Sequence, residues 1–361
     1  MRKISLFLVA AMLVSLLTGC MGTPVVYYTD CTCPADSHTA VDPTEPAADN
    51  DVTPVEGAVK TGLYIGTDIS ASKNATAEEN GVAAYDVTIA AVTVDDNGVI
   101  VSCAIDSIKA EVTFDATGAL TSDTAMEVLT KNELGENYGM VAWGGAVAEW
   151  NEQAAALAAY AVGKTVEELK NGAVGETGYA VDADLATTAT IYLGGYVSAI
   201  EAAVANAQHL GAQAADELRL AIIPGVSGSK AADAENNGTA QLDVDVTALT
   251  VNGGVITSCT IDSLQAKVSF DAAGAVTTDL SAPVATKNEL GENYGMVAWG
   301  GAIAEWNEQA ASFAGYVTGK TAAEVAGIAV SETTAPTDAD LAATVTIAVG
   351  GFQALIAKAM Q

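Results

Sequence analysis

The sequence predicts an α+β fold made of two tandem copies of one domain, each an antiparallel β-meander followed by helices packed on one sheet face. Three observations predict it. The chain contains a long internal repeat, each copy begins with alternating apolar and polar segments joined by turn residues, and each copy ends in segments with helical spacing. Because 50% of the residues are hydrophobic, the chain can fill two cores.

The internal repeat sets the domain organisation. Residues 98–205 align with residues 254–361 at a constant offset of 156, and one residue is deleted in a turn just upstream of the second copy. A period this long indicates a domain with its own core and not a solenoid unit. We therefore expect a first domain over 60–209 and a second over 216–361.

Each copy opens with segments typical of strands. Residues 85–94 and 99–105 alternate in polarity and are joined by an Asp-Asp-Asn-Gly turn, and a third segment at 110–114 is followed by Asp-Ala-Thr-Gly. Alternation of this kind, bounded by Asp, Asn and Gly, predicts an antiparallel meander.

A stripe of apolar residues follows, with steps of three and four, and it predicts one face of a long helix. The stripe comprises Met140, Trp143, Val147, Trp150, Ala154 and Leu157 in the first copy, and Met296, Trp299, Ile303, Trp306, Ala310 and Phe313 in the second. The spacing alone places the four tryptophans in the core.

Further helices are expected after this stripe. Thr165 with Glu168, and Thr321 with Glu324, have the spacing of a capping box, in which each side chain satisfies the other residue's backbone N–H. A last helix is expected over 189–207, and its twin closes the chain near Met360.

The N-terminus predicts secretion and anchoring. Arg2 and Lys3 precede an apolar run over 4–17 that is short for a membrane span, so residues 1–19 are expected to be a signal peptide. The ending Leu-Thr-Gly-Cys resembles the lipobox of bacterial lipoproteins. This resemblance implies cleavage before Cys20, acylation of its thiol, and a location at the extracytoplasmic face of the cell membrane, bound through the lipid.

A tether is expected over residues 20–59. Five of the eight prolines fall here among Thr, Asp, Ala and Glu, a composition that buries too little apolar surface to fold. Cys31 and Cys33 lie within this segment, without the second cysteine pair or histidine cluster that a metal site would need.

Composition excludes several classes of function. The formal net charge of −31 opposes binding to nucleic acid. His38 and His209 are the only histidines, one in the tether and the other between the domains, so a Ser-His-Asp triad or a histidine-rich metal site is not expected within either domain. Cys103 and Cys259 lie on expected strands as inert thiols. The sequence indicates neither an enzyme nor a metal site.

The most closely repeated stretch is a candidate ligand loop. Residues 130–155 recur at 286–311 with one change, Val147 to Ile303. One interpretation makes the polar residues of this loop a docking site for a ligand, and the other makes the block a structural unit. The candidate residues are Lys131, Asn132, Glu133, Asn137 and Tyr138, with the twins Lys287, Asn288, Asn293 and Tyr294.

The order of elements resembles the FMN-binding domain of bacterial respiratory flavoprotein subunits and Gram-positive surface flavin lipoproteins. That family closes with an Asp-x-x-Ser/Thr-Gly-Ala-Thr loop, whose final Thr can carry FMN through a phosphoester. The resemblance implies this role for Thr188 and Thr344, with Asp182 and Asp338 as the acid of the motif. Here Ala186 replaces the Gly of the family motif.

Besides a spacer with no ligand at all, two functions therefore stay open at the level of sequence. One is an extracytoplasmic electron carrier with one FMN per repeat and a redox partner. The other is a non-catalytic surface module that binds a small ligand or a protein partner through the repeated loop.

Overall fold

A computed structural model describes residues 57–361. The signal peptide, Cys20 and all but the last residues of the expected tether lie outside the described residues. Within 57–361, no helix has both the length and the apolar character needed to cross a membrane.

The described chain forms two three-stranded antiparallel sheets, one from each copy, with strand orders β1-β2-β3 and β4-β5-β6. The strands are β1 (Lys60–Asp68), β2 (Gly81–Val94), β3 (Ile100–Phe114), β4 (Glu217–Gly225), β5 (Gly238–Asn252) and β6 (Val255–Phe270). Helices follow each set of three strands, which confirms the α+β fold with two tandem copies.

The helical segments correspond one to one in the two copies. The first copy has α1 (Lys131–Leu134), η1 (Gly135–Tyr138), α2 (Met140–Gly144), α3 (Trp150–Ala161), α4 (Val166–Ala173), α5 (Leu185–Thr188) and α6 (Gly194–Ala205). The second has α7 (Lys287–Leu290), η2 (Gly291–Tyr294), α8 (Met296–Gly300), α9 (Trp306–Val317), α10 (Ala322–Ala326), α11 (Ala339–Ala342) and α12 (Gly350–Ala359).

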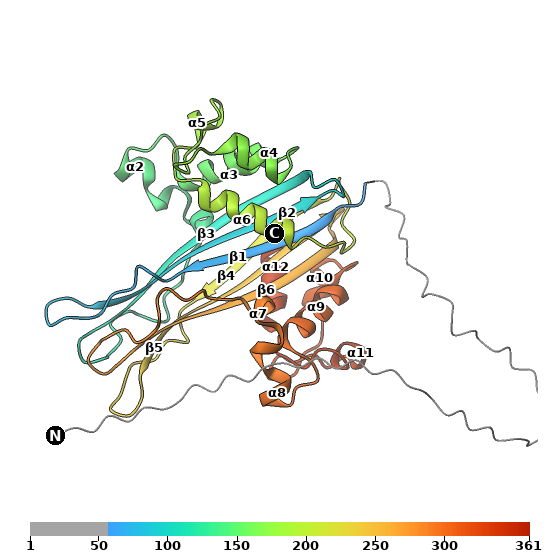
Figure 1. Cartoon of the computed structure of the whole chain (residues 1–361). Helices are drawn as coiled ribbons and strands as arrows, with labels where there is room; N and C mark the ends of the chain where they lie inside the picture. The colour runs from blue at the N-terminus through green and yellow to red at the C-terminus, as the bar shows by residue number, and fades with distance from the viewer. Residues whose placement is uncertain (1–56) are drawn as a thin grey trace, which may run out of the picture. The chain divides into compact units, whose positions relative to one another are not determined.

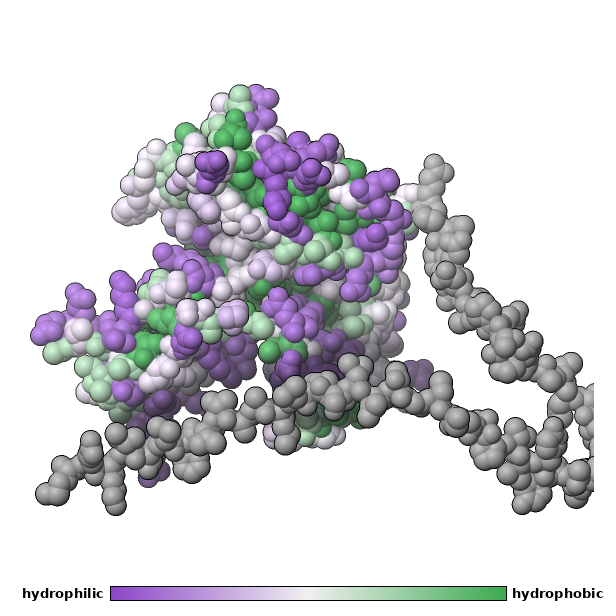
Figure 2. Space-filling view, viewed as in Figure 1, coloured by the Kyte–Doolittle hydropathy of each residue, from purple (hydrophilic) through white to green (hydrophobic). Residues whose placement is uncertain are grey.

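The two sheets pack face to face, and each carries its own helices on the outer face (Figure 1). Helices α3 and α6 cover the first sheet, while α9 and α12 cover the second. Hydrophilic side chains are spread over the visible face of this assembly, with apolar side chains between them among the upper helices (Figure 2).

The strands divide their side chains between two cores, because successive residues point to opposite faces. Tyr85, Val87 and Ile89 point inward to the core between the sheets, where they meet residues such as Val244 and Val246 of β5. Ala90 and Val92 point outward to the helices. Each copy thus has its own helix–sheet core, and both copies share the central core.

Reciprocal contacts hold the copies together. The rings of Phe114 and Phe270 stack with their centroids 3.9 Å apart. The Ala75 N–H donates to the Gly274 carbonyl at 2.8 Å, and the Ala232 N–H of the second copy donates to the Gly118 carbonyl of the first at 2.8 Å. This reciprocity shows that the two copies are related by approximate two-fold symmetry.

The expected meander differs from the observed one in its strands. The two expected segments at 99–105 and 110–114 are parts of one continuous strand, β3, which begins at Ile100. The third strand of the sheet is β1, which the sequence pattern did not reveal. Gly62 interrupts the apolar pattern of β1 because α6 packs directly against it. A Cβ at Gly62 would lie 2.0 Å from the Ala203 carbonyl oxygen.

The prediction of one long helix across the tryptophan stripe was wrong. Helix α2 ends at Gly144, Gly145 adopts a left-handed φ of 64°, and α3 begins only at Trp150. Consequently Trp150 and Trp306 are buried as expected, but Trp143 and Trp299 are 90% and 91% exposed. Glycine supplies the backbone conformation that ends the helix.

The other helix predictions are confirmed. Thr165 and Glu168 form the expected capping box, as do Thr321 and Glu324. The last helix of the first copy, α6, lies within the expected range, and α12 ends at Ala359. Burial raises the pKa of the Cys103 and Cys259 thiols to about 12, as suits unreactive cysteines.

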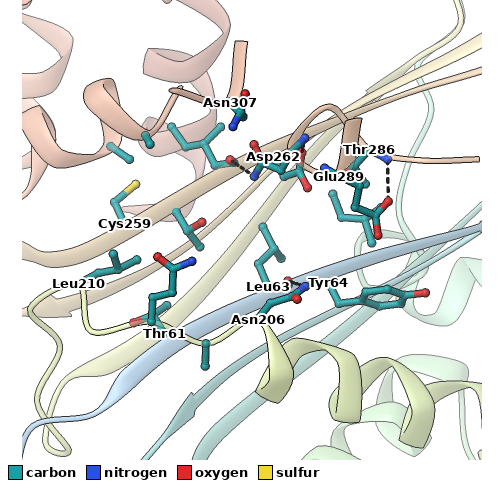
Figure 3. A pocket seen from close by; sticks show the side chains of 18 of the residues that line it. Thr61, Leu63, Tyr64, Asn206, Leu210, Cys259, Asp262, Thr286, Glu289 and Asn307 are labelled. Atoms are coloured by element: carbon teal, nitrogen blue, oxygen red, sulfur yellow. Dashed lines mark hydrogen bonds between the residues drawn. The ribbon is translucent and has the colours of Figure 1, made fainter. Parts of the chain in front are cut away.

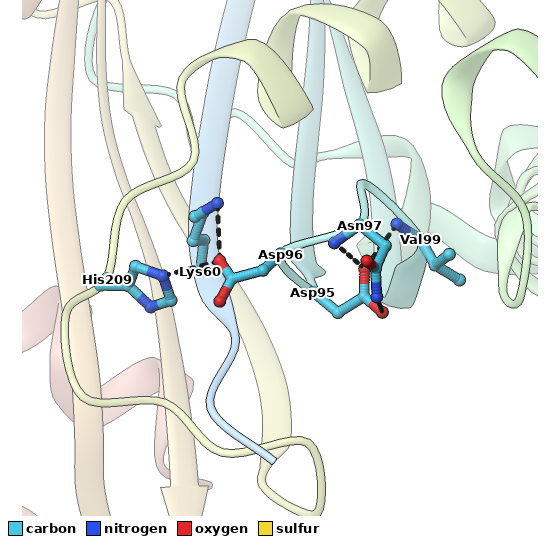
Figure 4. A network of polar contacts seen from close by, with 6 residues as sticks. All are labelled: Lys60, Asp95, Asp96, Asn97, Val99 and His209. Carbon is cyan, nitrogen blue, oxygen red and sulfur yellow. Dashed lines mark hydrogen bonds and ion pairs between the residues drawn. The ribbon is translucent and has the colours of Figure 1, made fainter. Parts of the chain in front are cut away.

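A polar network joins the segment between the copies to the first sheet (Figure 4). The Asp96 carboxylate in the β2–β3 turn pairs with Lys60 Nζ at 2.8 Å and with His209 Nε2 at 2.9 Å. The hydrogen bonds from Lys60 and His209 hold the pKa of Asp96 below its ordinary value. All three side chains are partly exposed, so this network positions the connecting segment more than it stabilises the fold.

Candidate functional site

Hydrogen bonds to its own backbone and to the neighbouring strand hold the repeated loop. Thr130 and Glu133 form a capping box at the start of α1. Asn132 fastens the loop to β3, because its backbone N–H donates to Asp106 Oδ1 at 3.1 Å and its Nδ2 donates to the Ile105 carbonyl at 2.9 Å. Asn288 makes the same two bonds in the second copy. Asn132 and Asn288 therefore hold the loop in place, and Asn137 and Asn293 are exposed.

Two buried polar residues that sequence reasoning missed complete this unit. The Glu149 carboxylate accepts the N–H groups of Met140 and Val141 at 2.8 and 3.0 Å, which satisfies the start of α2. Gln153 Oε1 accepts the N–H of Thr190 at 2.7 Å, and its Nε2 donates to the Ala148 carbonyl at 2.8 Å. The twin residues repeat these bonds, so backbone satisfaction explains much of the near-identity of the two blocks.

A cavity of about 340 Å³ lies between the loop, the first sheet and α6. Two of the expected loop residues, Lys131 and Tyr138, line it. The complete lining is Thr88, Lys131, Tyr138, Met140, Trp150, Ile191, Tyr192, Gly195 and Tyr196. A few polar groups among aromatic walls are typical of a small-molecule site.

The aromatic walls are held rigidly. The rings of Trp150 and Tyr196 meet edge to face with centroids 5.6 Å apart, and Trp150 Nε1 donates to the Tyr196 hydroxyl at 3.0 Å. Burial raises the pKa of Tyr196 and of Tyr138, so both hydroxyls stay protonated at neutral pH. The pocket thus has flat apolar walls with hydroxyl groups at fixed positions.

Lys131 is the charged group of the cavity. Its side chain is 8% exposed, and its Nζ lies 5.3 Å from the centre of the Tyr138 ring and 5.0 Å from that of Trp150. Within residues 57–361, Lys131 Nζ makes neither an ion pair nor a hydrogen bond to a protein oxygen. Burial lowers its pKa, and the carboxylate of Asp86 acts in the opposite direction.

The second copy has a different lining at the corresponding place. Lys287, Tyr294 and Trp306 are retained, with Lys287 Nζ 4.8 Å from the centre of the Trp306 ring. Three other residues change: Thr88 corresponds to Asp245, Tyr192 to Ala348 and Tyr196 to Phe352. Asp245 Oδ1 accepts the Ser263 hydroxyl at 2.7 Å. Its Oδ2 lies 3.5 Å from the place that a Cβ on Gly351, the twin of Gly195, would take.

The residues matching the flavin motif make local contacts. Asp182 Oδ1 accepts the N–H groups of Asp184 and Leu185, and Asp338 caps α11 in the same way. Thr188 is exposed and donates to the Leu185 carbonyl, as Thr344 does to Leu341. None of these four residues lines the 340 Å³ cavity. A four-residue helix with an occupied Asp cap does not fit a phosphate cradle, so we derive no step through FMN.

Comparison with known proteins found no family model, no curated protein and no solved structure that matches the chain.

Proposed function

We propose that this chain is a ligand-binding module displayed at the extracytoplasmic face of a membrane, anchored through lipid at Cys20. Its first repeat binds a small carboxylate that carries a flat ring, in the cavity beside the repeated loop. The observation that carries the proposal is the Lys131 ammonium, which lies at the cavity and forms no ion pair with a protein carboxylate among residues 57–361.

The charge of the ligand follows from the cost of burial. Packing of the Lys131 side chain removes part of the hydration of its ammonium, and the rings of Tyr138 and Trp150 replace only part of that loss. A ligand carboxylate would supply a charge-assisted hydrogen bond to this ammonium. Because the whole chain is strongly acidic, this local cation is needed to overcome long-range repulsion of an anion.

The shape of the ligand follows from the walls. Trp150, Tyr192 and Tyr196 give flat apolar surface, and the hydroxyl of Thr88 lies on the sheet beneath. Ring-to-ring contact contributes about 0.5–1.5 kcal/mol beyond the burial of apolar area. A flat ring of modest size therefore suits the cavity better than a branched aliphatic acid.

Calorimetric titration with matched pairs of ligands tests the proposal. We expect benzoate, 4-hydroxybenzoate or indole-3-acetate to bind the purified chain at least tenfold more tightly than the corresponding neutral amide. Lys131→Met should remove this preference, whereas Lys287→Met should leave it unchanged. Equal binding of acid and amide, retention of the preference in Lys131→Met, or no binding across the panel would contradict the proposal.

An electron carrier with one FMN per repeat stays a prediction that rests on the resemblance alone. A visible spectrum of the chain purified from its native host tests it, because a bound flavin absorbs near ~450 nm and a colourless sample excludes one.

A further inference from the structure

A second cavity, of about 620 Å³, lies where the two copies meet, between the edge of β1, the β6 strand and α9 (Figure 3). It is a separate space from the pocket of Lys131, and its lining combines polar and acidic side chains with apolar ones. Asp262, Glu289, Asn206, Asn288 and Asn307 contribute side chains to it. A lysine elsewhere in the same chain indicates the chemistry of the ligand that this cavity suits.

This lysine is Lys358, which lies at the symmetry-related place in the other half of the molecule. Its Nζ forms an ion pair with Glu133 Oε1 in the loop of the first copy. The same Nζ donates to the Ile222 carbonyl, on the edge strand β4, at 2.5 Å. A primary ammonium on an alkyl chain is therefore held there between a loop carboxylate and an edge carbonyl.

The internal repeat identifies the twins of these three residues. Glu133 corresponds to Glu289, and Ile222 corresponds to Ile65 on β1. Both twins line the 620 Å³ cavity. Lys358, however, corresponds to Ala202 of α6. The cavity thus has the carboxylate and the carbonyl that hold an ammonium in the other half, but its own helix carries only a methyl group at the matching position.

The Glu289 carboxylate has one oxygen available. Oε2 accepts the Thr286 N–H at 2.9 Å, as Glu133 Oε2 accepts the Thr130 N–H. Oε1, the atom that pairs with Lys358 in the case of Glu133, has no hydrogen bond or ion pair within the described part of the chain.

The Ile65 carbonyl points toward the same space. In an antiparallel edge strand, alternate residues direct both backbone groups away from the neighbouring strand. Thr61 bonds outward to Gln208, and the Leu63 carbonyl accepts Asn206 Nδ2 at 3.1 Å. Ile65 shares their parity, so its carbonyl also faces outward, at the cavity.

Other lining residues suit an alkylammonium. Asp262 is 8% exposed and adds a second carboxyl group, and Asn307 Oδ1 is buried without a partner among the described residues. Ala311 and Ala314 of α9, with Leu63 of β1, supply apolar wall for an alkyl chain.

We propose that this cavity binds an aliphatic primary amine, with its ammonium between Glu289 and the Ile65 carbonyl as Lys358 lies between Glu133 and the Ile222 carbonyl. The alkyl chain lies against the apolar wall. This site is independent of the proposed carboxylate pocket, so either can fail without the other.

Titration of the purified full chain with n-pentylamine, followed by NMR shifts of the Glu289 loop at about 0.15 M salt, tests the proposal. We expect saturable binding that 1-pentanol and pentyltrimethylammonium do not show, because the first has no charge and the second no N–H donor. Glu289→Gln should weaken binding at least tenfold. Glu133→Gln is the matched control, and it should leave amine binding unchanged while it loosens Lys358.

Ala202→Lys provides a second test that does not remove any contact. The new lysine should reach Glu289 as Lys358 reaches Glu133, abolish the binding of pentylamine, and raise Tm. Unsaturable shifts, equal shifts with pentanol, or unchanged binding in either Glu289→Gln or Ala202→Lys would overturn the proposal.

Discussion

The two copies share one scaffold, but they differ in which of their corresponding sites is occupied by a charged side chain of the protein itself. In the first copy, Lys131 lies in an aromatic cavity without a carboxylate partner, whereas the second copy places Asp245 at the corresponding position of the sheet. At the proposed amine site the copies exchange roles, because the place is occupied beside the first copy's loop and open beside the second copy's loop. Glu133 of the first copy is paired with Lys358, and Glu289 of the second copy lines a cavity.

Four of the substitutions between the copies change groups on which these two sites depend. They are Thr88 and Asp245, Tyr192 and Ala348, Tyr196 and Phe352, and Ala202 and Lys358. The capping boxes and the glutamine bonds that shape the loop are the same in both. A duplicated scaffold can therefore keep its framework while each copy specialises by single changes at its cavity.

The largest expected effect concerns the core that the copies share. Phe114→Ala removes one of two stacked rings, and we expect the free energy of unfolding to fall by about 3–5 kcal/mol. Because Phe270 belongs to the other copy, both copies should lose stability in one cooperative transition. Urea unfolding followed by circular dichroism measures this. A second transition at the position of the unaltered protein would show that the copies fold independently, and Trp143→Phe serves as a surface control.

A smaller effect on the free energy of unfolding is expected from Asp262, the buried acid that lines the proposed amine site. Burial raises the pKa of Asp262 from 3.8 to about 6, with the Glu289 charge adding to it. Between about pH 4 and pH 6 the folded state binds this proton and the unfolded state does not. Stability from this group is therefore present at low pH and is lost as pH rises through the folded pKa, by at most about 3 kcal/mol.

Asp262→Asn tests this dependence. The difference in unfolding free energy between the variant and the unaltered chain should change with pH in that window, measured by urea unfolding at several pH values. Burial also raises the pKa of the twin Asp106, so Asp106→Asn should act with the same sign. A pH-independent difference for Asp262→Asn would contradict the expected proton uptake.

The third prediction gives the 340 Å³ cavity of the first copy the carboxylate that the second copy has at the corresponding place. Thr88→Asp places a carboxylate where the second copy has Asp245, and we expect ring carboxylates to bind about 2 kcal/mol more weakly, or roughly 30-fold. Thr88→Asn has nearly the same shape without the charge and should lose much less. Isothermal titration with 4-hydroxybenzoate distinguishes them, and equal losses would mean that shape, and not charge, separates the copies.

Local signals in the sequence predicted the fold better than they predicted the site. The capping box of Thr165 is a contact between neighbours in the chain, and it was readable from spacing alone. The stripe through Trp143 has regular helical spacing, but Gly144 and Gly145 end the helix. The spacing of the apolar residues does not indicate where a helix ends. The sequence pattern did not reveal strand β1, because Gly62 interrupts its apolar residues. Gly62 allows α6 to pack closely, and this contact joins residues 141 positions apart.

The cavities depend on residues that only the folded chain brings together. Lys131 and Tyr138 could be named as a polar loop, but Thr88 and Tyr196, which lie on other elements, carry no sign of a common pocket in the sequence. The second cavity is further from sequence reasoning, because its recognition depends on a backbone carbonyl and on the absence of a lysine at Ala202.

The number of ring-carboxylate sites per chain tests the specialisation of the copies most directly. Isothermal titration of the full chain with 4-hydroxybenzoate should give one site, which Lys131→Met removes and Lys287→Met retains. Two equivalent sites, no site, or a single site that survives Lys131→Met would contradict it.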